Sequence, residues 1–130
     1  MDKYSAQIIA SDREGLQTIS AIVSGGKVKV TDIKYLSSNK VFLLSIERNK
    51  IEQNKQSKKI NSIIKFELIS LVKSKNIDQK NNQLVLELIA IDYLKNKDDY
   101  EINLIFNNNA HIVLTTEVID IRLDNFDKEE

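Results

Sequence analysis

The chain has 130 residues, of which 42% are hydrophobic, so it can bury the core of one domain. Lysine plus arginine and aspartate plus glutamate both number 19, so no net charge attracts nucleic acid or an anionic membrane. The sequence has no cysteine, which excludes disulfides, thiolate metal ligands and cysteine nucleophiles.

The first residues, MDKYSAQIIASDREG, contain no long apolar run, and the longest apolar runs elsewhere have the length of strands. We therefore expect no signal peptide and no membrane span. A cytoplasmic location is expected, which the lack of cysteine suits. We expect one domain over residues 1–130, with disordered or frayed ends at about 1–5 and 127–130.

Residues 11–25 have the pattern of the one long helix. Ser11 and Glu14 have the spacing of a capping box, and Gly25-Gly26 is a typical helix end. The large apolar residues between them recur at helical spacing and form one stripe: Leu16, Ile19, Ile22 and Val23. An isolated helix of this length is marginal in water, so we expect the stripe to pack against the rest of the chain.

The remaining chain has the patterns of strands separated by polar turns. A kink is expected at Thr31-Asp32, and polar loops are expected at 49–59 and 76–83. The alternation within 60–75 changes phase near Leu68-Ile69, which predicts a β-bulge or a tight turn. The expected strands are 7–10, 27–30, 33–36, 41–48, 60–75 with its interruption, 84–94, 100–106 and 110–116.

Residues 117–126 fit two structures. Ile119, Leu123 and Phe126 have the spacing of a short helix, whereas Ile119, Ile121 and Leu123 have that of a strand. We favour the short helix. The fold class is then α+β, with one N-terminal helix on a bent, mainly antiparallel sheet or half-barrel of about 7–8 strands.

Few residues suggest chemistry. His111 is the only histidine and has no cysteine or second histidine with which to bind a metal. Asp120 and Asp124 could pair for acid–base work, but a solvated acidic face is favoured. The lysine-rich loop near Lys55 has no interleaved aromatic residue, so we expect no nucleic acid binding. The phosphate-loop, dinucleotide-binding and nucleophile-elbow motifs are absent.

Four blocks of residues match the pattern of one known family. The first two are carried by Ala10, Asp12, Glu14, Leu16, Ile19, Ser20 and Ala21, and then by Asp32, Ile33, Tyr35, Leu36, Phe42, Leu44 and Arg48. The other two are carried by Phe66, Val72, Ser74, Ile77, Asp78 and the run LIAIDY at 88–93, and then by Ile112, Leu114, Glu117, Ile119, Arg122 and Leu123. In these blocks the chain resembles the alphaproteobacterial proteins called domain of unknown function 2948.

The resemblance covers nearly the whole chain, from Ile9 to about Phe126. The chain departs from the family pattern at 107–109, where the family has glycines, at Lys65, where it often has histidine, and at Ile51, where it has an aromatic residue. The resemblance implies a cytoplasmic bacterial protein, and it implies no activity or cofactor.

Asp32, Arg48, Glu117 and Arg122 form the predicted set of binding residues, because the resemblance falls on all four charged side chains. The leading hypothesis is a non-catalytic protein-interaction domain that acts as a homodimer or as a subunit of a complex. The alternative is a small-molecule or nucleotide-binding domain, or a weak enzyme, with a polar cleft around Arg48, Glu117 and Arg122. Neither hypothesis requires a cofactor or a metal.

The metal expectation can be tested directly. One histidine and no cysteine cannot build a usual transition-metal site. Elemental analysis of protein purified from its native cell should therefore find no stoichiometric zinc or iron. Equimolar zinc or iron that survives dialysis against a chelator would contradict the expectation.

Overall fold

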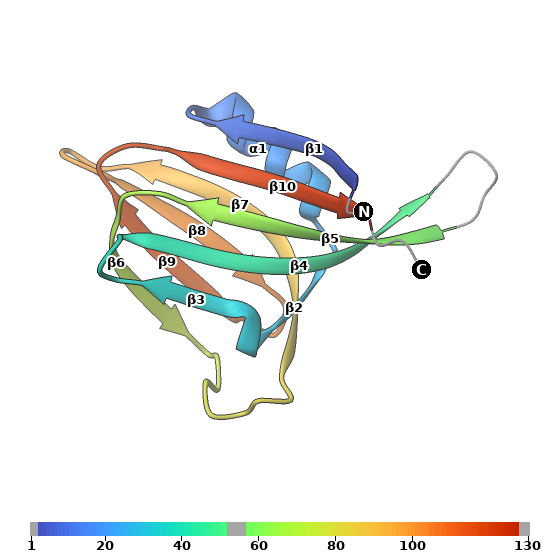
Figure 1. Ribbon diagram of the computed structural model, residues 1–130. Helices are drawn as coiled ribbons and strands as arrows, with labels where there is room; N and C mark the ends of the chain where they lie inside the picture. The colour runs from blue at the N-terminus through green and yellow to red at the C-terminus, as the bar shows by residue number, and fades with distance from the viewer. Residues whose placement is uncertain (1–2, 52–56, 128–130) are drawn as a thin grey trace.

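The chain folds into one helix and a curled antiparallel sheet in this computed structural model, which describes residues 3–51 and 57–127 (Figure 1). The first elements are β1 (Lys3–Ala10), α1 (Arg13–Val23), β2 (Lys27–Lys29), the short 3-10 helix η1 (Val30–Asp32), β3 (Ile33–Leu36) and β4 (Val41–Ile51). They are followed by β5 (Ser57–Phe66), β6 (Ile69–Lys75), β7 (Val85–Lys95), β8 (Tyr100–Phe106), β9 (His111–Thr116) and β10 (Ile121–Asp127).

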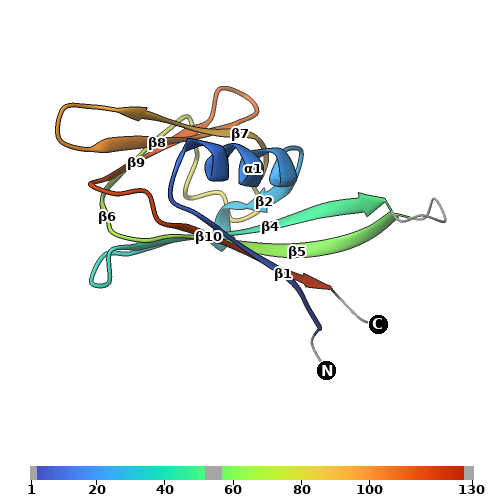
Figure 2. The ribbon, with the colours of Figure 1, turned by 90° about the horizontal axis from the view of Figure 1, so that it is seen from above.

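Within the described residues, ten strands form the sheet: nine lie in the order β1-β10-β5-β4-β2-β7-β8-β9-β6, and β3 pairs with β4 beside them. Every pairing is antiparallel. Figure 2 shows that the sheet folds over, with β10, β5 and β4 in one layer and β7, β8 and β9 in the other. The short strand β2 joins the layers, since it pairs with β4 at Lys27 and with β7 along its length. The predicted fold class is confirmed, with more strands than expected.

The helix α1 lies between the two layers at one end of the curl (Figure 2). Its first turn is capped by Asp12, whose side chain accepts a hydrogen bond of 2.8 Å from the Gly15 N–H. The predicted cap at Ser11 is therefore wrong by one residue, because aspartate serves this role as well as serine does. Gly25 follows with φ +87, a conformation that favours glycine and confirms the predicted end.

Ser20 of α1 and Ser24, the residue that follows α1, also hydrogen-bond to the backbone of β7. Ser20 Oγ accepts from the Ile91 N–H at 2.9 Å, and Ser24 Oγ donates to the Ile89 carbonyl at 2.9 Å. These bonds fall where β2 no longer runs beside β7. They satisfy backbone groups of β7 that would otherwise lack a partner.

The core fills the space between the layers and α1. Leu16, Ile19 and Val23 of the predicted helical stripe are buried, while Ile22 packs against the core from a partly exposed position. Phe42 and Phe66 meet edge to face with ring centroids 5.9 Å apart. The core is therefore continuous from the helix to both layers of the sheet.

The C-terminal segment is a strand, so the helix favoured for 117–126 is wrong. β10 lies between β1 and β5 and pairs with both along its whole length. Ile121 and Leu123 are buried, whereas Arg122 and Asp124 face the other side, which is the two-residue period of a strand. Hydrogen bonding to two neighbouring strands outweighs the ambiguous local pattern.

Other turns follow the sequence. Leu68, with φ +59, turns the chain between β5 and β6, and Asn108 and Asn109, with φ +58 and +60, turn it between β8 and β9. The expected loop 49–59 is shorter than predicted, because β4 and β5 remain paired as far as Ile51 and Ser57. Its residues 52–56 lie outside the described part of the chain, as do 1–2 and 128–130, whereas residues 3–5 expected to be frayed belong to β1.

The burial of α1 gives a stability prediction. Ile19 is fully buried, so Ile19→Asp should lower the free energy of unfolding by about 3–5 kcal/mol through a lost apolar contact and an unpaired buried charge. Ala21→Asp, on the exposed face of the same helix, is the matched control and should cost far less. Urea unfolding measures both values, and equal losses in the two variants would contradict the packing.

Candidate functional site

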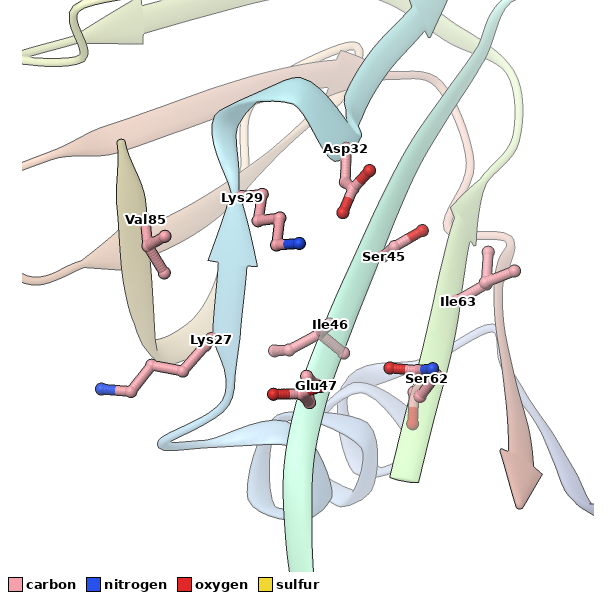
Figure 3. A pocket seen from close by; sticks show the side chains of 10 residues that line it. Lys27, Lys29, Asp32, Ser45, Ile46, Glu47, Ser62, Ile63 and Val85 are labelled. Carbon is pink, nitrogen blue, oxygen red and sulfur yellow. The ribbon is translucent and has the colours of Figure 1, made fainter. Parts of the chain in front are cut away.

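A cleft opens on the outer face of the sheet where β2 leaves β4 (Figure 3). β4 pairs with β2 at Glu47 and with β3 from Leu44, and η1 carries the intervening chain out of the ladder. The cleft has a volume of about 560 Å³. It is lined by Lys27, Lys29, Asp32, Ser45, Ile46, Glu47, Asn61, Ser62, Ile63 and Val85.

Two opposite charges, those of Lys29 and Asp32, face this cleft. Figure 3 shows Lys29 of β2 and Asp32 of η1 pointing into the space between β2 and β4, while Lys27 points away. Lys27 Nζ lies 2.8 Å from Glu87 Oε1, and Lys59 Nζ lies 3.8 Å from Glu47 Oε1. Among the described residues, Lys29 and Asp32 make no ion pair, so both charges are available to a bound molecule.

The described lining of the cleft includes the hydroxyl-bearing residues Ser45 and Ser62 and no histidine. To act as a nucleophile, the hydroxyl of Ser45 would need a nearby base, and His111 lies on β9 in the other layer, with Nε2 3.4 Å from Asn103 Oδ1. In the described ranges, no group of three or more histidine, cysteine, aspartate or glutamate residues could hold a metal ion. The arrangement offers charged and polar groups to a polar ligand.

Arg48 lies on the inner face of β4, two residues beyond the buried Ile46. Its Nε donates to Ser62 Oγ at 3.4 Å. Partial burial lowers the pKa of Arg48 below its ordinary value through desolvation, and an arginine shifted in this way remains charged at neutral pH. Arg48 therefore sits behind the cleft, on the opposite face of the sheet from Asp32.

The other two predicted residues lie elsewhere. Arg122 is on the outer face of β10, next to Ile9 and Lys65 in the register, with Nε 3.7 Å from Asp120 Oδ1. Glu117 is exposed between β9 and β10. The structure does not bring Arg48, Glu117 and Arg122 into one cleft, and a binding role for each stays a prediction.

Sequence reasoning found Asp32 but missed its partners in the cleft. Lys29 and Ser45 lie on different strands, and a single sequence carries no signal that they converge. The expected kink at Thr31-Asp32 was the only available hint, because a break in a strand opens the ladder beside it.

The outermost strands of the sheet, β1 and β6, differ in how their edges are protected. Within the described chain, β1 pairs only with β10, and β6 pairs only with β9. β6 carries Lys73 and Lys75 and has a register shift near Ile69, all of which discourage pairing with another chain. β1 has a register shift between Tyr4 and Ala6 but no charge from Tyr4 to Ala10.

Exposed apolar side chains on the second layer do not form a patch. Ile89 and Ile105 lie near one another, but Leu94 and Leu71 lie at opposite ends of a different row. Polar side chains interrupt these rows at the outward positions Asp92, Glu101, Asn103, Lys73 and Thr115. The edge of β1 is therefore the more continuous surface for a partner.

A sequence model of the family described as "Protein of unknown function (DUF2948)" matches residues 6–130. The chain belongs to this family. The DUF2948 match confirms the resemblance drawn from the sequence. No curated protein and no solved structure was found to match the chain. Among the described residues of this DUF2948 protein, no helix is long and apolar enough to cross a membrane.

Proposed function

We propose that this chain is a non-catalytic, cytoplasmic protein-interaction domain that pairs with a second copy of itself through the free edge of β1. One observation carries the proposal: β1 is an outermost strand of eight residues whose far edge has no strand partner among the described residues. Such an edge presents backbone donors and acceptors that an added strand can satisfy.

The distribution of charge favours a second copy of the chain as the partner of the β1 edge. After Lys3, residues 4–10 of β1 read YSAQIIA, and two antiparallel β1 strands place the Lys3 residues of the two copies at opposite ends, so no like charges meet. The same pairing through β6 would instead place two lysines from each copy, Lys73 and Lys75, at the interface. A symmetric antiparallel pair is also the simplest closed arrangement, because each copy uses the same surface.

The rest of the fold holds this edge in place. At its C-terminal end β1 is fixed by close packing on α1, where a Cβ built on Gly15 would lie 2.9 Å from Ala10 Cβ. Ile8 packs against the core, while Ile9 on the other face is 58% exposed. A second β1 would cover part of Ile9 and would add apolar contact to the backbone hydrogen bonds.

The alternative function, binding of a small molecule, has one observation in its favour. Lys29 and Asp32 share the outer cleft and make no ion pair among the described residues. A polar molecule that carries both a positive and a negative group would complement them. The charges are exposed, so each contact would contribute little, and we rank this function second.

The dimer can be tested by placing a lysine on the edge. Ile9→Lys should make the chain monomeric, because a charged side chain on an edge strand opposes pairing. Leu94→Lys is the matched control, since Leu94 is 59% exposed against 58% for Ile9 and lies on β7. Sedimentation equilibrium over a range of concentrations should show a dimer for the wild type and for the control only.

Hydrogen exchange locates the contact. Amides of residues 7–10 should exchange more slowly as the concentration rises, while those of β6 should not change. A wild-type chain that stays monomeric throughout, or an Ile9→Lys variant that still dimerises, would refute the proposal. Slowed exchange in β6 would move the interface to the other edge of the sheet.

A further inference from the structure

A second cleft lies inside the curl of the sheet, between β3 and β6. β3 pairs only with β4 and β6 only with β9 within the described chain, so two free edges border this space. The strands are tied at one end, where Tyr35 Oη donates to the Ile69 carbonyl at 2.7 Å and Ile69 N–H donates to the Lys40 carbonyl at 2.7 Å. From this tie they diverge toward the loop that connects β6 to β7 (Figure 1).

The cleft is mainly apolar and has the size of a ligand site. Its volume is about 390 Å³, within the range of about 300–1,000 Å³ typical of small-molecule sites. Phe42 and Ile112, 1% and 2% exposed, form its buried part. Its lining is Val30, Ile33, Tyr35, Phe42, Val72, Ser74, Ile77, Gln79 and Ile112.

The polar side chains of the lining are Ser74 and Gln79 at the rim of the cleft, and Tyr35 where β3 is hydrogen-bonded to Ile69. Ser74 Oγ accepts a hydrogen bond of 2.9 Å from Gln79 Nε2, and both residues are exposed. The Ser74 hydroxyl keeps its proton for a further bond, and the Gln79 amide carbonyl is still an acceptor. Tyr35 Oη, after donating to Ile69, can also accept.

None of the nine lining residues is charged. A carboxylate or ammonium group carried into the cleft would lose its hydration without gaining an ion-pair partner. A neutral molecule with an apolar body and one hydroxyl, amide or carbonyl group would instead place that group beside Ser74 and Gln79. The lining therefore selects against ions as well as in favour of apolar molecules.

We infer that the cleft between β3 and β6 binds an uncharged small molecule with an apolar body and a single hydrogen-bonding group. This site is independent of the β1 edge: it is lined by η1, β3, β4, β6, β9 and the β6–β7 loop. An experiment can therefore refute ligand binding at this cleft without refuting self-association through β1, and the reverse.

The test uses the full chain and a neutral apolar fluorophore, N-phenylnaphthylamine, displaced by decanol or by decanoate. The wild type should bind the fluorophore saturably, and decanol should displace it at a concentration about tenfold or more below that of decanoate, because decanoate carries a charge. Equal displacement by the two competitors, or no saturable binding, would overturn the inference.

A pair of substitutions tests whether the fluorophore binds in this cleft. Val72→Trp fills the cleft from β6 and should weaken fluorophore binding at least tenfold. Val113→Trp is the matched control, because Val113 is also a partly buried valine but lies on the outer face of the same layer, opposite Lys73. Binding retained by Val72→Trp, with a melting transition like that of the wild type, would refute the site.

A third variant remains informative if Val72→Trp does not fold. Ser74 is exposed, so Ser74→Ala should fold normally. This substitution should weaken the affinity for decanol about two- to tenfold, as expected for the loss of one hydrogen bond. It should leave the affinity for the fluorophore unchanged. An unchanged affinity for decanol would refute the role assigned to the rim.

Discussion

The structure depends on how a curled but unclosed sheet satisfies its free backbone groups. Among the described residues, ten antiparallel strands fold over as an open sheet, so edges remain at β1, β3, β6 and the part of β7 beyond β2. Buried backbone donors and acceptors need partners. The helix supplies them for β7 through the hydroxyls of Ser20 and Ser24, and its apolar face fills the space between the layers. In this protein the helix is both a part of the core and a cover for an edge.

The short 3-10 helix η1 has an effect larger than its three residues suggest. It lets the chain pass from β2, which pairs with β7, to β3, which pairs with β4. Both clefts lie beside it, because Asp32 lines the polar cleft outside the sheet and Val30 lines the apolar cleft inside. The two clefts differ in chemistry for the same reason that the two faces of the sheet differ: one faces solvent and the other faces the core.

The proposed dimer and the inferred ligand site both come from incomplete pairing, but they call for different partners. At β1 the free edge is open and carries no charge from Tyr4 to Ala10, so another strand can add to it. At β3 and β6 the two free edges face one another across a tapering gap that is tied at one end by Tyr35 and Ile69. The apolar lining of this gap suits a small molecule. Edges left open in a folded sheet are exceptions to the usual protection, and they are reasonable places to look for function.

Sequence alone determined the local features of this protein. The helical stripe of Leu16, Ile19 and Val23, the end of the helix at Gly25, and the asparagine turn after β8 all depend on neighbours a few residues apart. The family could be assigned as well, because its residues are spread along the whole chain. Asp32 was identified as a candidate binding residue, although not the cleft in which it lies.

The tertiary structure decided those features that depend on contacts between residues far apart in the chain. Residues 117–126 fitted a helix or a strand, and the choice followed from the position of β10 between β1 and β5. Arg48 and Arg122 looked like members of one site, but the two-residue period of the strands turned them to opposite faces of the sheet. Lys29 and Ser45 meet in one cleft only because η1 interrupts a ladder. Side-chain periodicity is local and readable, whereas strand order and register are set by contacts between residues far apart in the chain.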